Sequence, residues 1–243
     1  MQYFLFYNQE LLLTENNSIP YDMGEVVDCK YTFVSHDKKY IAANINSVPT
    51  NFKTVKLRDS YDVLSREDYL NAGKAYELVF WNENNKYCGK CGGLLRQVSD
   101  INKKCDCCGT EIWPKISPAI IVLIYDEDRI LLVKSKTFKG TYFGLVAGFV
   151  EFGESLEEAV VREIKEETNL EVDNIKYFDS QPWPYPNGLM IGFTAKYKSG
   201  HLNIQESELQ EGNWYSINNL PEIPKPLSMA NMLINHYLNK YKE

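Results

Sequence analysis

The chain has 243 residues, 44% of them hydrophobic, and a formal net charge of −7. It is long enough for two compact units, and no run reaches the roughly eighteen apolar residues of a membrane helix, so no membrane partner is expected. The acidic balance, with no basic block, argues against general binding of nucleic acid through its phosphates.

Residues 1–82 are predicted to form a small β-rich domain. Aromatic or β-branched runs predict short strands at residues 2–7, 29–34 and 40–45. Polar turns are expected between them, at residues 16–18 and 36–38. A helix is predicted to begin with Ser65 and to end near residue 81.

Residues 83–114 hold two C-x2-C-G knuckles with thirteen residues between them, in which Cys107 is spare. Four thiolates at this spacing suit a tetrahedral structural zinc ribbon with one Zn²⁺ per chain. Its ligands would be Cys88, Cys91, Cys105 and Cys108. The alternative, two disulfides, would leave Cys29 unpaired, and the absence of an export signal predicts a reducing, cytoplasmic location.

Residues 115–243 alternate strand and helix patterns and are predicted to form a separate domain. Buried strands joined as a hairpin are expected at residues 119–125 and 129–134, with a further strand at 189–197 and a short one at 212–215. Residues 142–149 lead into a helix at 156–168. A closing helix at 226–242 places its apolar side on Met229, Leu233, Ile234, Tyr237 and Leu238.

The helix at residues 156–168 carries the strongest indication of chemistry. Ser155 and Glu158 form a capping box at its start, and Asn169 suits a helix stop. Its apolar residues share one broad arc of the helical wheel: Leu156, Ala159, Val160, Val161 and Ile164. Glu163 and Glu167 fall inside that arc.

Glu166 lies at the edge of the same arc, whereas Glu158, Arg162 and Lys165 point away from it. Carboxylates on an inward face are costly to ionise unless a cation meets them. A hard divalent cation, Mg²⁺ or Mn²⁺, prefers such oxygen ligands and bridges to phosphates. The alternative is a set of surface glutamates on an ordinary amphipathic helix.

This segment resembles the Nudix hydrolase family. The family pattern is filled in register by Gly148, Glu154, Arg162, Glu163, Ile164, Glu166, Glu167 and Leu170. Asn169 stands where the family usually has glycine, and asparagine is the next best residue for a left-handed helix end. The resemblance implies an α/β fold (α+β in the broad sense), an α/β/α sandwich with a mixed sheet.

The resemblance also assigns roles to individual residues. It implies catalytic metal ligands at Glu163, Glu166, Glu167 and Glu208, with Glu211 in reserve for Glu208. The general base is left open between Glu208 and a glutamate of the motif. Gly148, Glu154 and Arg162 are structural members, and Arg162 is expected to orient a glutamate or the preceding loop without easily reaching the metal cluster. Histidine catalysis is not expected, because His36, His201 and His236 lie in no motif.

Residues 180–190, SQPWPYPNGLM, contain three prolines alternating with two aromatic residues. Prolines exclude a helix or a central strand and hold a rigid extended loop. One interpretation is a stiffened connection whose aromatic rings pack on the core. The segment also resembles a signature of the NADH pyrophosphatase subfamily, with Tyr185 in place of the usual phenylalanine. The cysteine ribbon precedes the Nudix domain in that subfamily too.

The subfamily resemblance implies a set of substrate contacts. They are Trp113, Ala147, Phe149, Gln181, Pro182, Trp183, Pro184, Tyr185, Pro186, Asn187, Gly188 and Ala230. Trp113 and Phe149 are candidates for stacking on a base, although Trp113 could instead pack the ribbon against its neighbour.

The implied reaction is metal-dependent hydrolysis of NADH or NAD⁺ to AMP and nicotinamide mononucleotide, by a homodimer. The subfamily also removes NAD caps from RNA 5′ ends. Three alternatives are open: a Nudix hydrolase of another nucleoside diphosphate derivative such as ADP-ribose, a non-catalytic Nudix nucleotide sensor, and a zinc-ribbon nucleic-acid module. Few cations near the ribbon argue against the last: Lys90, Arg96, Lys103 and Lys104.

Overall fold

The computed structural model describes residues 1–23, 31–136 and 140–240. The chain divides into two compact units. The N-terminal unit comprises Met1–Lys115 together with Trp183–Asn187, and the C-terminal unit comprises Ile116–Pro182 and Gly188–Glu243. The predicted strand residues 29 and 30, and with them Cys29, lie outside the described part.

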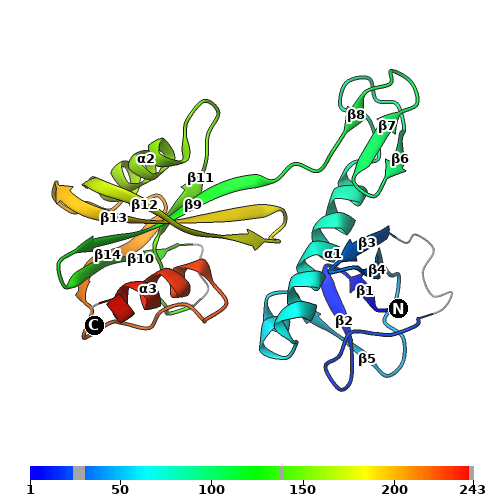
Figure 1. Cartoon of the computed structure of the whole chain (residues 1–243), viewed down its shortest axis with the longest axis horizontal. Coiled ribbons are helices and arrows are strands. Elements are labelled where there is room, and N and C mark those ends of the chain that lie inside the picture. Colours follow the sequence, from blue (N-terminus) through cyan, green and yellow to red (C-terminus); the bar gives the residue numbers. More distant parts are fainter. Residues whose placement is uncertain (24–30, 137–139, 241–243) are drawn as a thin grey trace. The chain divides into compact units, whose positions relative to one another are not determined.

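The N-terminal unit contains a five-stranded sheet in the order β3-β4-β1-β2-β5, covered on one face by helix α1 (Figure 1). The strands are β1 (Tyr3–Tyr7), β2 (Glu10–Thr14), β3 (Tyr31–Ser35), β4 (Lys38–Asn44) and β5 (Phe52–Lys56). A 3-10 turn, η1 (Asp59–Asp62), precedes α1 (Arg66–Asn84), which begins at the N-cap Ser65 as predicted. The core between sheet and helix includes Phe4, Phe6, Leu11, Ala72 and Ala75.

The predicted strands at residues 2–7 and 40–45 are confirmed as β1 and β4, and the described part of the third is β3. Strands β2 and β5 were not predicted. In β2 the three leucines Leu11, Leu12 and Leu13 are all fully buried, so the strand lacks the alternation that indicates one. β5 is an edge strand with no fully buried residue.

The predicted ribbon segment forms a three-stranded sheet joined to the end of α1. Its strands are β6 (Leu95–Ser99), β7 (Asn102–Cys105) and β8 (Glu111–Ile112). Lys103 of β7 is buried and its Nζ donates to the carbonyl oxygens of Asn82 and Asn85, at 3.0 and 2.9 Å. A cation at the C-terminal carbonyls of a helix is favourable, so Lys103 fastens the ribbon to α1.

The C-terminal unit is a mixed sheet in the order β12-β13-β9-β10-β14, with β11 also pairing with β9. β13 runs parallel to β9, whereas β10 and β11 run antiparallel to it. The strands are β9 (Ser117–Asp126), β10 (Arg129–Ser135), β11 (Val146–Phe149), β12 (Glu171–Trp183), β13 (Gly188–Ser199) and β14 (Leu209–Ser216).

Helices α2 (Leu156–Thr168) and α3 (Met229–Lys240) cover opposite faces of this sheet (Figure 1). Alternate residues of β9 serve the two layers: Ile120 and Val122 pack with α2, whereas Ile121 and Leu123 pack with α3. The predicted α/β/α sandwich with a mixed sheet is therefore confirmed. In the described residues no helix is long and apolar enough to cross a membrane.

Two details differ from the predictions. The β9–β10 pairing is confined to the end next to the turn, because β11 occupies the rest of that side of β9. The segment at 180–190 is not a continuous loop: β12 runs to Trp183 and β13 starts at Gly188. β12 is an edge strand with no buried residue, which explains why its pattern gave no prediction and why it accommodates Pro182.

Helix α2 ends as the sequence predicts, and its end provides a test. Asn169 has a left-handed backbone, φ 59° and ψ 17°. Because a β-branched side chain is strained there, Asn169→Val should lower the free energy of unfolding by about 1–2 kcal/mol, whereas Asn169→Gly should keep or slightly raise it. Urea titration measures the difference, with Lys196→Val at an exposed position of β13 as the control. Equal stability of the two Asn169 variants would contradict a left-handed helix end.

Candidate active site

Helix α2 turns two carboxylates into the unit. The side chains of Glu163 and Glu167 are buried, at 9% and 4% exposure, whereas Glu166 is exposed, as the helical wheel predicts. The placement of Val161 on the apolar arc is wrong, since it is 49% exposed. It lies at the margin of the arc and borders an open hollow instead.

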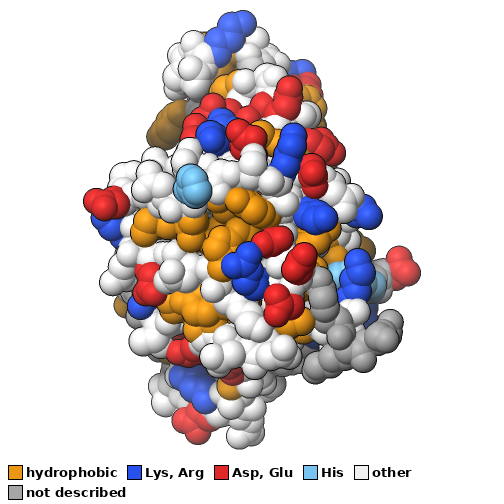
Figure 2. Space-filling view, turned by 90° about the vertical axis from the view of Figure 1, so that its left-hand side faces the viewer, with side chains coloured by type: hydrophobic (Ala, Val, Ile, Leu, Met, Phe, Trp, Pro, Cys, Tyr) orange, Lys and Arg blue, Asp and Glu red, His pale blue; other side chains and the backbone are white. Residues whose placement is uncertain are grey.

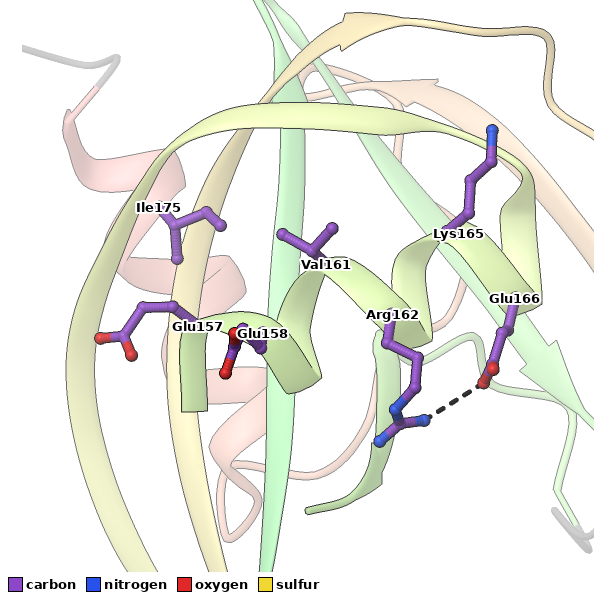
Figure 3. Close-up of a pocket in the computed structure, with 7 residues that line it drawn as sticks. All are labelled: Glu157, Glu158, Val161, Arg162, Lys165, Glu166 and Ile175. Carbon is purple, nitrogen blue, oxygen red and sulfur yellow. Dashed lines mark hydrogen bonds and ion pairs between the residues drawn. The ribbon is translucent and has the colours of Figure 1, made fainter. Parts of the chain in front are cut away.

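This hollow, of about 520 Å³, lies between the outer side of α2 and Ile175 of β12 (Figure 3). It is lined by Glu157, Glu158, Val161, Arg162, Lys165, Glu166 and Ile175. Figure 3 shows Arg162 and Glu166 turned toward each other at one end, while Lys165 points away from them. The hollow thus follows the polar side of α2, and the two buried carboxylates do not line it.

Arg162 connects three glutamates and the loop before α2. Its Nε and Nη2 donate to Glu154 at 3.0 and 2.7 Å, and Nη2 also donates to the Phe149 carbonyl at 2.9 Å. Its Nη1 donates to Glu163 at 2.9 Å and to Glu166 at 3.1 Å. The expectation that Arg162 does not easily reach the cluster is wrong, because its long side chain extends to both carboxylates.

Glu154 is held in its ionised form. The hydrogen bonds from Arg162 and from the Glu151 backbone N–H lower the pKa of Glu154 to about 2. The hydrogen bond with Glu154, together with those to Glu163 and Glu166, raises the pKa of Arg162. Glu154 and Arg162 therefore form a permanently charged pair that joins the loop before α2 to the helix.

Gly148 of β11 lies directly under the Glu163 carboxylate. A Cβ atom at Gly148 would overlap the two oxygens and the carboxyl carbon of Glu163. Gly148 is also fixed by pairing with Ile120 of β9, so the backbone cannot easily withdraw. Any other residue at 148 would displace Glu163, and this is the reason for a glycine at the first position of the motif.

Glu167 is the most strongly perturbed acid of the site. Burial, followed by the charges of Glu163, Glu208 and Glu166, raises its pKa to about 8. Burial also raises the pKa of Glu163, although Arg162 opposes the shift. The Oε2 atom of Glu167 is buried without a hydrogen-bond partner. An unpartnered buried carboxylate oxygen among other carboxylates fits a divalent cation.

Glu208 acts on this cluster electrostatically. Its charge contributes to the raised pKa of both Glu163 and Glu167. The segment before it is fastened to the end of α2, since the Gln205 N–H donates to the Glu167 carbonyl at 2.9 Å and the Glu208 N–H to the Gln205 carbonyl at 3.1 Å. The carboxylate of the reserve candidate, Glu211, accepts a hydrogen bond from Asn213 instead.

Lys136 was missed by the sequence reasoning. Its backbone N–H donates to the Glu208 carbonyl at 2.9 Å, and its Nζ donates to the Glu206 carbonyl. It therefore fixes both sides of the turn that carries Glu208. No sequence signal indicates this, because the contact joins residues about seventy positions apart.

The four predicted cysteine ligands also come together. The Sγ atoms of Cys88, Cys91, Cys105 and Cys108 all lie within 4.8 Å of one another and could hold a metal ion. The spare residue, Cys107, is exposed outside the group, but its N–H donates to the Cys105 sulfur at 3.4 Å. A Cβ atom at Gly93 would lie 2.6 Å from the Cys107 Cβ and 3.0 Å from the Cys105 sulfur. Gly93, directly after the first knuckle, is thus required sterically.

The predicted substrate contacts fall into several environments. Ala147, Phe149, Pro182 and Pro186 are exposed, and Trp113 is 52% exposed. Gln181 and Gly188 are partly buried, and the Nε2 of Gln181 donates to the Leu227 carbonyl at 2.8 Å. Ala230 is 6% exposed in the core beneath α3, so its side chain offers little area to a ligand. Trp183–Asn187 belong to the N-terminal unit.

Comparison with known proteins decides the family. Residues 115–235 match the NUDIX domain model. The chain belongs to the Nudix family. Over 174 residues it is 40% identical to the NAD-capped RNA hydrolase NudC of Pseudomonas aeruginosa strain LESB58. The matched region makes up 71% of this chain and 62% of that protein.

A second relative carries the same name. The NAD-capped RNA hydrolase NudC of Pseudomonas fluorescens strain Pf-5 is 40% identical over 171 residues, 70% of this chain and 62% of the relative. The Nudix chain thus matches about 62% of the length of these curated relatives. A Nudix hydrolase from Nitrosomonas europaea is similar in fold, with a TM-score of 0.56 at 21% identity over 65% of this chain and 92% of that one.

Burial of Glu167 should make the stability of this Nudix unit depend on pH. The folded unit keeps a proton on Glu167 up to about pH 8, whereas the unfolded chain loses it near pH 4.5. Stability should therefore fall as the pH rises from about 4.5 to 8. Glu167→Gln carries no such proton and should become more stable than the parent with rising pH, by on the order of a few kcal/mol at pH 8.

Calorimetry without divalent cations in the buffer measures this difference. Glu157→Gln, an exposed position of the same helix, is the control and should show no comparable pH-dependent gain. A stability difference between Glu167→Gln and the parent that stays constant from pH 4.5 to pH 8 would contradict the burial effect.

Proposed function

We propose that this chain is a metal-dependent NAD(H) diphosphatase, which hydrolyses the diphosphate of NADH or NAD⁺ to AMP and nicotinamide mononucleotide. The observation that carries the proposal is the buried pair Glu163 and Glu167, with one Glu167 oxygen left without a partner. The names of the relatives support NAD-capped RNA 5′ ends as a further substrate.

The residues that would hold Mg²⁺ or Mn²⁺ are Glu163, Glu166, Glu167 and Glu208. The bound ion would neutralise the diphosphate and lower the pKa of an attacking water. Glu167 must release its proton to serve as a ligand. Glu154, which is ionised because its pKa is low, fixes the guanidinium of Arg162. That guanidinium in turn donates to the carboxylates of Glu163 and Glu166 and restricts their positions. Gly148 leaves the space that Glu163 needs.

Substrate recognition is proposed to use exposed aromatic rings and the segment around Gln181. Phe149 is 65% exposed and directly follows Gly148, so it can offer a face to a planar base. Trp113, which belongs to the N-terminal unit and is 52% exposed, is a separate candidate. Stacking of this kind contributes roughly 1–3 kcal/mol per base. Figure 2 shows acidic and basic side chains interspersed among apolar ones on the face in view. Because this face has no broad basic surface, RNA is expected to contact only a few residues there.

The cysteine group is proposed to bind one Zn²⁺ per chain. The Cys88–Cys108 and Cys91–Cys105 sulfur pairs are 3.8 and 3.5 Å apart. Tetrahedral Zn²⁺ with bonds of about 2.3 Å requires sulfurs about 3.8 Å apart, which agrees with these distances. We further propose a cytoplasmic homodimer. Gel filtration with light scattering tests the dimer.

Product analysis tests the reaction. The protein is incubated with Mg²⁺ or Mn²⁺ and separately with NADH, NAD⁺, ADP-ribose or NAD-capped RNA, and the products are separated by chromatography. AMP and reduced nicotinamide mononucleotide are expected from NADH. Glu167→Gln should lose turnover while keeping its fold and its zinc, and full activity of this variant would disprove its role as a ligand.

The other results of the same assay have definite meanings. Cleavage of ADP-ribose alone would replace the proposed substrate with another nucleoside diphosphate derivative. Binding of NADH without any cleavage would indicate a nucleotide sensor.

Removal of a cysteine ligand tests the zinc site. Cys88→Ser should lose the metal, because the serine hydroxyl is a poor zinc ligand, and should lower the melting temperature of the N-terminal unit. Metal analysis should find one Zn²⁺ per chain in the parent and in Cys107→Ser, the matched control for the spare cysteine. Retention of zinc by Cys88→Ser, or its loss from Cys107→Ser, would show that the ligand set is wrong.

A further inference from the structure

The segment Trp183–Asn187 joins two strands of the C-terminal unit, yet it is packed as part of the N-terminal unit. Asn187 donates from Nδ2 to the Lys115 carbonyl at 2.8 Å. Pro184 is buried, and Tyr185 packs against the core cluster of α1 and its sheet. The aromatic segment is thus held by residues far away in the sequence.

The hydroxyl group of Tyr185 has a specific partner. The Tyr69 and Tyr185 hydroxyl oxygens are 2.7 Å apart, and Tyr69 is a buried residue on the first turn of α1. Tyr69 is itself packed edge-on against Tyr61, with ring centres 5.4 Å apart. Phenylalanine, the residue that the subfamily resemblance leads one to expect at 185, could not make this hydrogen bond.

One turn further along α1, Gly73 provides room for Pro184. A Cβ atom at Gly73 would lie 3.0 Å from the Cγ of Pro184, which is tighter than ordinary contact. Glycine in a helix interior is unfavourable by roughly 0.5–1 kcal/mol relative to alanine, so its use here needs a packing reason. Close approach of Pro184 is such a reason.

A third contact holds Trp183. The guanidinium of Arg58 lies 5.3 Å from the centre of the Trp183 ring, a cation–π distance. The Trp183 and Tyr185 rings also pack edge to face, 5.0 Å apart. By contrast, Gln181, two residues before Trp183, is bonded to the Leu227 carbonyl of the C-terminal unit. The proline-rich segment is therefore fastened to each unit by separate contacts.

We propose that Arg58, Tyr69 and Gly73 are positioning residues for the Trp183–Asn187 segment. The N-terminal β-rich unit thereby sets the conformation of this segment and through it the affinity for the dinucleotide. This rests on the proposed NAD(H) diphosphatase activity. The rings of Trp183 and Tyr185 are held by protein contacts, so their effect on the substrate is exerted through the shape of the segment.

Hydrogen exchange measured by mass spectrometry tests the positioning without reference to activity. In Gly73→Leu the new side chain should displace Pro184, and the peptide covering residues 181–190 should exchange faster. Gly73 is buried, so leucine there overpacks the site and should also lower the melting temperature; peptides of the five-stranded sheet show whether the faster exchange is confined to the segment. Leu70→Ala, at an exposed position of the same helix, is the control and should exchange like the parent. Unchanged exchange in Gly73→Leu overturns the proposal.

Kinetics test the consequence for the substrate. Loss of the tyrosine–tyrosine hydrogen bond in Tyr69→Phe should raise KM for NADH about 2- to 12-fold, with little change in kcat. Because either substitution breaks the same bond, the double variant with Tyr185→Phe should be no worse than the worse single variant. Additive effects, or a loss in kcat alone, overturn the proposal.

The two measurements separate the possible failures. A parent protein that does not cleave NADH disproves the proposed function, and hydrogen exchange then still decides whether α1 holds the segment. Faster exchange of residues 181–190 in Gly73→Leu, together with an unchanged KM for NADH in Tyr69→Phe, overturns the link between the position of the segment and the affinity for the dinucleotide.

Discussion

Two carboxylates buried against a sheet form the constraint on which the Nudix unit depends. Glu163 and Glu167 are directed inward by α2, where water cannot solvate their charge, and burial raises the pKa of each. Without a cation the arrangement is unfavourable, and the surrounding structure must maintain it. The capping box at Ser155 and the left-handed Asn169 fix the ends of α2, and the Arg162–Glu154 pair fixes its polar side.

Close approach of the backbone completes the site. Glu163 rests on Gly148, which β9 holds in place, and the end of α2 receives the N–H of Gln205, three residues before Glu208. The site is thus formed by a helix, a strand and a turn that satisfy one another's steric and hydrogen-bonding needs. The burial that raises the pKa of Glu167 makes the metal-free unit less stable, and in the proposed function it also prepares Glu167 to bind a cation, a common relation between function and stability.

Local patterns made the box helix and the ribbon predictable from the sequence. The ends of α2, its inward glutamates and the four cysteines follow from spacing along the chain. Contacts between distant residues were not predictable: the reach of Arg162, the clamp of Lys136 on residues 206–208, and the edge strand β12 depend on what folds beside them. Val161 is another example. A helical wheel gives the direction in which its side chain points, but it does not show how far the sheet extends under the helix, and Val161 is exposed.

The proline-rich segment allowed two interpretations from its sequence, core packing or substrate contact, and the geometry of Pro184 and Tyr185 supports the first. Pro184 and Tyr185 are packed against α1, whereas the Gln181 side chain is bonded within the C-terminal unit. A rigid proline-rich connection transmits position along its length, since its φ angles are restricted. Packing of residues 184 and 185 can therefore fix the backbone position near Gln181. In the proposed role, the β-rich unit holds residues 183–187, which group with it and not with the core of the Nudix unit.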